Sequence, residues 1–148
     1  MPIATDPAVD TAQIASRLRL AVVRLARRLR QQGEPGISAS LLSALSTIER
    51  DGPMTLGDLA IAERVQPPSM TRVVASLLEA RLVRRTRDRL DGRISWVEVS
   101  TEGARLLQRS RKRAGAYLSR KLARLSPAEL DVLVRAAEIL ERLQVDAD

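Results

Sequence analysis

Two short stretches decide the fold: residues 67–72, which read PPSMTR, and residues 88–93, which read DRLDGR. The first opens a helix, because two prolines suit a helix's first turn, where amide donors have no intrahelical partner. The second lies between residues 82–87 and 94–99, two segments of strand-like composition, and its Asp-Gly pair is a strong turn signal. A helix followed by a hairpin with a cationic tip predicts a winged helix-turn-helix, a fold that binds duplex DNA.

The helix that begins at Pro67 has an apolar side and a side of small polar residues. Its buried side is expected to hold Met70, Val73, Val74, Leu77 and Leu78. Its exposed side is expected to hold Ser69, Thr71, Arg72, Ala75 and Ser76. Small residues let a helix sit deep in a major groove, hydroxyls can bond base edges or phosphates, and an arginine can bond guanine through two donors. A plain core helix with a polar outer side is the alternative.

Five arginines lie on or beside the predicted hairpin: Arg84, Arg85, Arg87, Arg89 and Arg93. In one interpretation they form surface salt bridges with Asp88 and Asp91, each contributing at most about 1 kcal/mol. In the other, Asp91 orients Arg93 so that its planar guanidinium enters the narrow minor groove of DNA. Both interpretations can hold for the same pair.

Hydrophobic periodicity predicts six helices and one hairpin. The helices are expected at residues 11–32, at 38–50, from a capping box of Thr55 and Asp58, from Pro67, from Thr101 as a cap, and from Ser126 as a cap closed by Glu129. The first, fifth and sixth helices carry more apolar surface than a small winged domain can cover, which predicts a homodimer.

We therefore expect a mainly α protein with a small β-hairpin wing, an α+β fold. Residues 38–100 would form the winged helix-turn-helix DNA-binding domain, and residues 1–37 and 101–148 a helical dimerisation region.

Charge and composition narrow the function further. The chain of 148 residues has a net charge of +7, and residues 17–30 and 105–124 contain basic residues and no acids, whereas residues 125–148 are mainly acidic. This charge favours a phosphate-rich partner. The chain lacks Cys and His, which excludes zinc sites built on those ligands, thiol chemistry and Ser-His catalysis. We expect no cofactor, no metal site and no catalytic residues.

Nothing in the sequence predicts a secretion signal or a membrane partner. The N-terminus carries Asp6 and Asp10 with scattered apolar residues, and the apolar runs are too short for a membrane span. We therefore expect a cytoplasmic protein.

From about residue 38 to residue 107 the chain resembles the MarR family of bacterial transcription regulators. The matching patterns are Ser-x-Thr-Arg-x-Val-x-x-Leu from Ser69, Leu-Val-x-Arg from Leu82, Asp-x-x-Asp-Gly-Arg from Asp88, and Val-x-Thr-Glu-Gly from Val99. The resemblance implies a triangular homodimer that places two winged domains on a pseudo-palindromic operator and acts as a repressor. The implied DNA-binding residues are Pro68, Ser69, Thr71, Arg72, Ser76, Arg85, Arg87, Arg89, Asp91 and Arg93.

The resemblance also implies release from DNA by a small anionic or aromatic effector. The chain contains no Phe, one Trp and one Tyr, which argues against an aromatic-lined pocket, so the sequence leaves an effector open. Arginines beneath the first and fifth helices could hold an anion. A further departure is Arg81, at a position after the recognition helix where relatives often carry Gly and where a left-handed backbone would strain any other residue.

Two other classes of protein are alternatives. A non-specific nucleoid or RNA-binding basic helical protein would explain the charge, but such proteins usually have lysine-rich tails or stacking aromatic residues. An enzyme would need paired carboxylates or an activated nucleophile in one cleft, and the sequence places neither.

Overall fold

The computed structural model describes residues 10–145. Within this range the elements, in chain order, are α1 (Thr11–Gln31), α2 (Ala39–Asp51), β1 (Met54–Thr55), α3 (Leu56–Glu63), α4 (Pro67–Glu79), β2 (Val83–Arg87), β3 (Ser95–Val99), α5 (Thr101–Leu122) and α6 (Pro127–Val145). The predicted mainly α fold with a small β wing is confirmed, and each predicted helix is present.

The sheet has one strand more than the sequence predicted. β3 lies between β1 and β2 and is antiparallel to both, so the hairpin of β2 and β3 gains a third strand. Met54 pairs with Val97 and Thr55 with Trp96. The prediction missed β1 because two residues are too short to show an alternating pattern, and the capping role of Thr55 was the stronger local signal.

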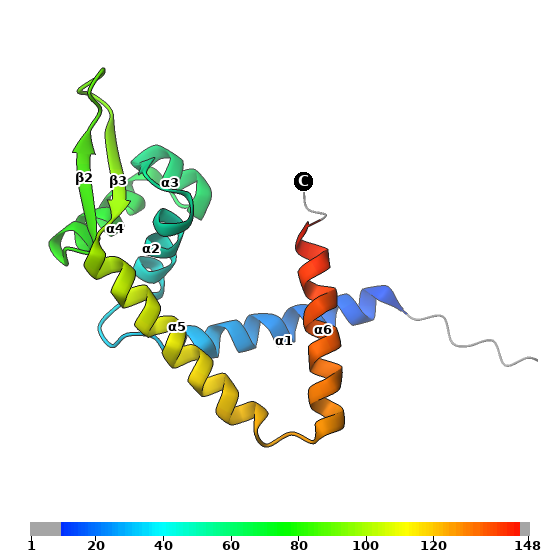
Figure 1. The fold of residues 1–148 in the computed structure, drawn as a ribbon. Coiled ribbons are helices and arrows are strands. Elements are labelled where there is room, and N and C mark those ends of the chain that lie inside the picture. The colour runs from blue at the N-terminus through cyan, green and yellow to red at the C-terminus, as the bar shows by residue number, and fades with distance from the viewer. Residues whose placement is uncertain (1–9, 146–148) are drawn as a thin grey trace, which may run out of the picture.

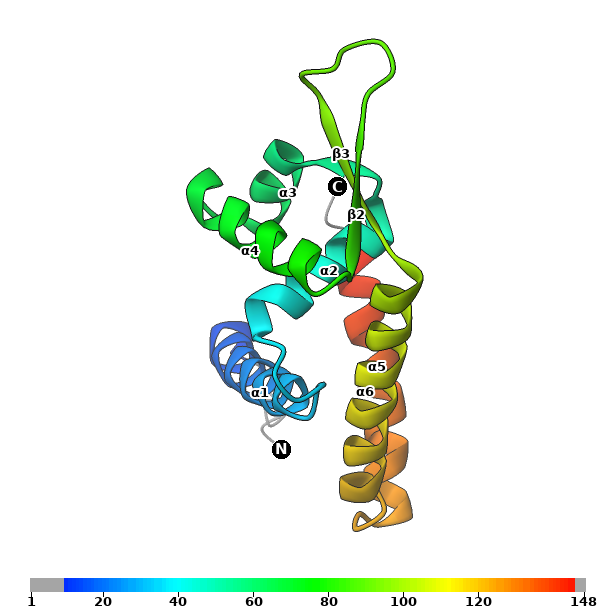
Figure 2. The ribbon, with the colours of Figure 1, turned by 90° about the vertical axis from the view of Figure 1, so that its left-hand side faces the viewer.

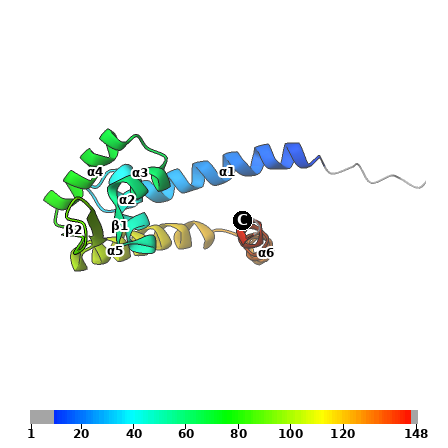
Figure 3. The same cartoon turned by 90° about the horizontal axis from the view of Figure 1, so that it is seen from above.

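A lobe formed by α2, α3, α4 and the sheet stands at one end of the molecule, and the β2–β3 wing extends beyond its helices (Figure 1). α5 leads away from this lobe, and α6 turns back after it (Figure 1). A view from the side shows α1 and α5 on opposite sides below the lobe (Figure 2). From above, α6 is seen end on, at the far end of α5 from the lobe (Figure 3).

The core lies inside the lobe. Its largest fully buried side chains come from α2, α3, α4, β3 and α5: Leu45, Ile48, Leu59, Met70, Val74, Leu77, Val97 and Leu107. In contrast, none of the residues of α1 or α6 is buried. Of the three helices outside the lobe, α1, α5 and α6, only α5 therefore contributes buried residues to the core, among them Leu106 and Leu107.

The helix caps largely follow the prediction. Thr55 accepts the Asp58 N–H, and Ser126 and Glu129 form the reciprocal bonds of a capping box, as predicted. Ser38, predicted only as the first residue of its helix, is the cap of α2 and accepts the Leu41 N–H. The prediction was wrong at α5, where Ser100 and not Thr101 is the cap. The Ser100 hydroxyl accepts the Gly103 N–H at 3.0 Å and donates to the Arg81 carbonyl at 2.7 Å, a second bond that the sequence did not reveal.

Arg81 takes the left-handed conformation that its position in the family pattern suggested. Its φ is 61°, and its N–H donates to the Leu78 carbonyl while the Leu82 N–H donates to the Leu77 carbonyl. These bonds form a Schellman motif, which ends α4 and turns the chain into β2. The backbone is therefore the one that glycine would favour, held here by a residue that pays a steric cost for it.

Gly103 marks the closest approach between α5 and the sheet. A Cβ atom at this position would overlap the Leu82 carbonyl oxygen and lie 2.9 Å from a Val99 methyl group. The Leu82 carbonyl also accepts the Ser100 N–H at 3.0 Å, so it cannot move without breaking that bond. Only glycine lets the first turn of α5 sit against the start of the wing.

We predict that Gly103→Ala lowers the free energy of unfolding by about 1 to 3 kcal/mol, because the added methyl group overlaps backbone that cannot relax freely. Gly115→Ala is the matched control: it lies on the same helix with nothing near its Cβ position. It should raise the free energy of unfolding by about 0.5 to 1 kcal/mol through helix propensity. Urea denaturation measures both, and equal effects of the two substitutions would contradict the account.

Candidate nucleic-acid interface

The exposed side of α4 has the composition that the sequence predicted. Met70, Val74 and Leu77 are buried, with Val73 and Leu78 partly buried beside them. Because these residues fix the rotation of the helix, the other side faces away from the core. Pro68, Ser69, Thr71, Arg72 and Ser76 are all exposed there.

The polar groups of this surface are largely free. The Thr71 hydroxyl donates to the Pro67 carbonyl at 3.0 Å, which leaves its oxygen as an acceptor toward solvent. Ion pairs among residues 10–145 do not involve Arg72. The only acid on α4 is Glu79, in its last turn. The exposed face of α4 therefore presents hydroxyls and one available guanidinium to an incoming ligand.

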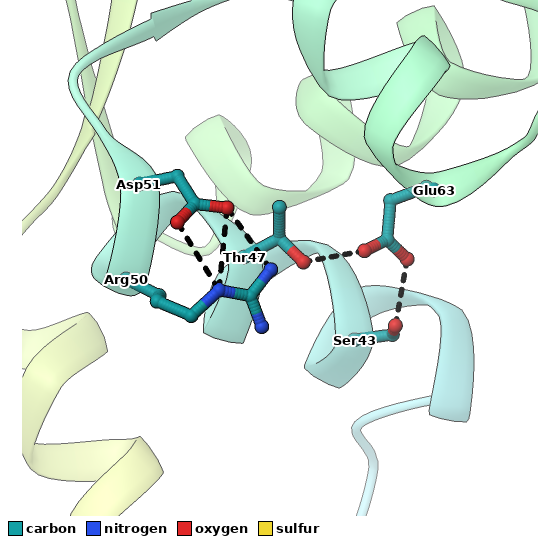
Figure 4. A network of polar contacts seen from close by, with 5 residues as sticks. All are labelled: Ser43, Thr47, Arg50, Asp51 and Glu63. Atoms are coloured by element: carbon teal, nitrogen blue, oxygen red, sulfur yellow. Dashed lines mark hydrogen bonds and ion pairs between the residues drawn. The ribbon is translucent and has the colours of Figure 1, made fainter. Parts of the chain in front are cut away.

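Glu63 fixes the turn that leads into α4. It is the last residue of α3, and its carboxylate accepts hydrogen bonds from Ser43 at 2.6 Å and Thr47 at 2.5 Å, both on α2 (Figure 4). Arg50 and Asp51 form a separate pair at the end of α2 (Figure 4). Sequence reasoning missed the Glu63 contact; the available signal was two hydroxyl residues one helical turn apart on α2, which put both groups on one face.

The strand register divides the arginines of the wing between two faces. Arg84 lies opposite Glu98 and forms an ion pair with it at 3.2 Å. Arg85 lies opposite the buried Val97, so Arg85 and Arg87 share the other face of the sheet, the one on which Val83 enters the core. The wing therefore presents Arg85 and Arg87 on the face that meets the helices.

Asp91 and Arg93 make the contact that the sequence predicted. Asp91 Oδ1 accepts the Arg93 backbone N–H at 3.0 Å and lies 3.2 Å from Arg93 Nε. The Arg93 side chain is nonetheless 93% exposed. Asp91 thus orients the guanidinium of Arg93, which remains open to a partner. Arg89 is exposed at the same tip and is open to a partner as well.

Asp88 organises the tip of the wing, and its predicted alternative role as a salt-bridge partner is wrong. Its Oδ1 accepts the N–H groups of Leu90 at 2.8 Å and Asp91 at 3.0 Å, and its Oδ2 accepts the indole N–H of Trp96 at 2.9 Å. These bonds to the charged form, that of Trp96 first, hold the pKa of Asp88 below its usual value. The Asp88 carboxylate thus accepts hydrogen bonds within the hairpin and forms no ion pair with the neighbouring arginines of the wing.

The arginines of α5 are partly neutralised within the chain. Arg109 and Arg113 lie 3.5 Å and 3.6 Å from the Glu34 carboxylate, and Arg111 pairs with Glu49. These ion pairs attach α5 to the α1–α2 connection and to α2. Much of the predicted basic run on α5 therefore serves the fold, whereas Arg72, Arg85, Arg87 and Arg89 take no part in the ion pairs of residues 10–145.

Metal-binding clusters and membrane-spanning helices are both absent from the part of the chain that the structure describes. No group of three or more Asp, Glu, His or Cys side chains there could hold a metal ion. Across residues 10–145, every helix is too short or too polar to cross a membrane.

Protonation of Asp88 should loosen the wing. Because its pKa in the folded protein is depressed, the carboxylate stabilises the tip above the usual value of 3.8, and this stabilisation is lost as the pH falls through the depressed pKa. The chain has one Trp, so the indole N–H signal of Trp96 in NMR reports this bond directly. It should shift with a midpoint below pH 3.8 in the wild type. In Asp88→Asn the shift should be absent; the same titration in that variant would contradict the assignment.

Known proteins share both the sequence and the fold. A model of the MarR family matches residues 37–95. An uncharacterised HTH-type transcriptional regulator of Mycobacterium bovis is 46% identical over 130 residues, which cover 87% of this chain and 91% of the relative. The chain spans nearly the full length of that relative.

Two solved structures extend the likeness to three dimensions. A crystal structure of a protein from Pseudomonas aeruginosa is 30% identical with a TM-score of 0.81, and the match covers 96% of this chain and 100% of that chain. A MepR mutant from S. aureus, solved bound to an oligodeoxyribonucleotide, shares the fold with a TM-score of 0.67 at 18% identity, over 88% of this chain and 97% of that chain.

The winged lobe, the polar face of α4 and these similarities all indicate a helix-turn-helix regulator. The family consists of transcription regulators and not of enzymes. The chain belongs to the MarR family of helix-turn-helix transcription regulators.

Proposed function

We propose that this protein is a sequence-specific repressor that binds a pseudo-palindromic operator as a homodimer in the cytoplasm. The observation that carries the proposal is the exposed face of α4, which presents hydroxyls and Arg72 with no acid before Glu79. A wing tipped by Arg93 extends from the same lobe (Figure 2). A DNA duplex offers a major groove for the first element and an adjacent minor groove for the second.

The site residues take three roles in this proposal. Pro68, Ser69, Thr71, Arg72 and Ser76 face the major groove. Arg93, oriented by Asp91, enters the minor groove, with Arg89 beside it. Arg85 and Arg87 contact phosphates and contribute affinity that does not depend on base sequence.

The homodimer is proposed because two helices leave apolar surface uncovered. On α1, Ile14, Leu18, Val22 and Leu25 form one stripe and are each 38% or more exposed. On α6, Leu133, Val134 and Leu143 are likewise exposed. Contiguous exposed apolar surfaces normally contact a partner, and a second copy of the chain offers the same apolar surfaces of α1 and α6 with two-fold symmetry.

The same reasoning supports a division of labour along the chain. Residues 38–100 form the DNA-binding domain, and the segments 1–37 and 101–148 supply the helical dimerisation region. Residues 1–9 and 146–148 of these segments lie outside the described residues. Two α4 helices held about 34 to 36 Å apart by that region would enter successive major grooves on one side of the duplex. The oligonucleotide bound to the MepR mutant, a protein of the same fold, supports a DNA partner for this chain.

A small anionic effector is the finer part of the proposal. A pocket of about 640 Å3 lies at the end of α1 and the α1–α2 connection, lined by Arg27 and Arg30 among others. Its arginines suit a carboxylate, whereas Glu34 also lines it and no Phe, Tyr or Trp contributes to it. A salicylate-like acid should therefore weaken operator binding and lose that effect in Arg30→Ala; unchanged binding with the acid would remove the effector from the account.

The alternative is a nucleoid or RNA-binding protein without sequence preference. Competition separates the two functions: a labelled duplex selected from a random pool is displaced by unlabelled RNA, random DNA or the same duplex. The repressor requires that the selected duplex compete far better than the others. Equal competition by all three would establish the alternative.

Single substitutions should sort the arginines by role. Arg72→Ala and Arg93→Ala should each cost about 1 to 3 kcal/mol in operator binding, and Arg72→Ala should also relax base preference. Arg87→Ala should weaken binding to all duplexes alike and reduce the slope of log K against log salt by about 1.

Arg84→Gln is the matched control, because Arg84 lies on the opposite face of the same strand and is paired with Glu98. It should leave operator affinity nearly unchanged in fluorescence anisotropy titrations. If Arg72→Ala kept both affinity and base preference, the face of α4 that meets DNA would be wrongly assigned.

A further inference from the structure

An apolar side chain at the tip of the wing is almost fully exposed to solvent. Leu90 is 99% exposed, the highest value among the exposed large apolar residues of the described chain. A single exposed leucine is ordinary on a protein surface. At this position it is unexpected, since turns favour Gly, Asn, Asp, Ser and Pro, and a leucine contributes nothing to the turn itself.

The backbone that carries Leu90 is held in place before any partner binds. Its own N–H donates to Asp88 Oδ1 at 2.8 Å, and the next N–H, that of Asp91, donates to the same oxygen at 3.0 Å. Trp96 holds the other oxygen of Asp88 from within β3. Because the turn is already ordered, presenting this side chain to a ligand costs little conformational entropy.

The charges beside Leu90 indicate the kind of surface it meets. Arg89 precedes it, and Arg93, 93% exposed, is oriented by Asp91 on its other side. An apolar group between two guanidinium groups suits a narrow groove with phosphates along its edges and sugar and base surfaces inside. The minor groove of DNA has this composition, and apolar side chains there insert at base steps that unstack easily.

A lipid surface with anionic headgroups also combines charge with an apolar interior. It is the weaker candidate, because stable attachment to a membrane surface requires an extended apolar face and the tip has one leucine. The wing also extends from the lobe that carries α4 (Figure 2). A duplex offers neighbouring grooves that can contact α4 and the wing together, which favours DNA over a lipid surface.

We propose that Leu90 is a minor-groove wedge: it enters beside Arg93, partly unstacks a pyrimidine–purine step, and thereby reads the deformability of the DNA at the outer edge of each half-site. The wedge rests on the proposed function and adds to it a specificity determinant that bonds no base edge. Operators should therefore carry flexible steps, TA or CA, where the wing lies, and the DNA should kink there.

The test uses the full-length protein and a duplex selected from a random pool, with 2-aminopurine placed at the step under the wing. The wild type should increase the 2-aminopurine fluorescence, and Leu90→Ala should bind about tenfold more weakly without that increase, the size expected for one specific contact. Leu90→Met, which keeps a long apolar side chain, should retain both properties. On a duplex whose flexible step is replaced by AA, wild type and Leu90→Ala should bind equally.

Several outcomes would overturn the wedge. Affinities of wild type and Leu90→Ala within twofold on the selected duplex would do so, as would a loss of affinity that is equal on both duplexes. Leu90-dependent binding to vesicles of anionic phospholipid would assign the tip to a membrane instead. If the wild type binds the selected duplex selectively and Leu90→Ala binds it equally well, the wedge alone is refuted. If the wild type prefers no duplex at all, the proposed function is refuted.

Discussion

Burial of one side of α4 is the constraint on which the rest of the interface depends. Met70, Val74 and Leu77 lie at the centre of the core, so the helix can take only one rotation about its axis. The opposite side, with Ser69, Arg72 and Ser76, then faces solvent as a geometrical consequence. Residues that never contact a ligand thus determine which residues can.

The same buried helix also places the wing. The chain leaves α4 through the Schellman motif at Arg81, and the next residue, Leu82, is again buried. Leu82 in turn accepts a hydrogen bond from Ser100 and touches the glycine at the start of α5. The position of the wing relative to α4, and the direction in which α5 leaves the lobe, are therefore set by one short turn in contact with the core.

The features that the sequence predicted are those with a local signal. Proline in the first helical turn, the alternation of apolar residues and the Asp-Gly turn each depend on neighbours in the chain, and the elements they predicted are present. The contact between Asp91 and Arg93 was predictable for the same reason, because the two residues lie two positions apart in the same turn. In contrast, β1 and the Glu63 contacts join residues far apart in the chain, and their partners are visible only after folding. The Trp96 bond to Asp88 spans the hairpin, and it depends on the register of β2 and β3, which the local signals did not predict.

Charge was the least predictable property, because sequence alone does not reveal which charges pair. The sequence shows only that residues 105–124 are basic and contain no acids, whereas the structure places Glu34 and Glu49 against arginines of this run. On the wing, Glu98 pairs with Arg84, while Asp88 accepts hydrogen bonds from the backbone of the turn. The fold therefore pairs some arginines within the chain and leaves others outside the ion pairs of residues 10–145, among them Arg72 on α4 and Arg85, Arg87 and Arg89 on the wing.

The central claim is that two copies of this chain present two α4 helices at a fixed separation to one duplex. Selection of binding sites from a random pool, followed by insertion of base pairs between the half-sites, tests it directly. The account predicts an inverted repeat whose half-site centres lie about 10 to 10.5 base pairs apart, and loss of tight binding when five base pairs are inserted. An enriched site without two-fold symmetry, or affinity that is indifferent to the inserted spacing, would contradict it.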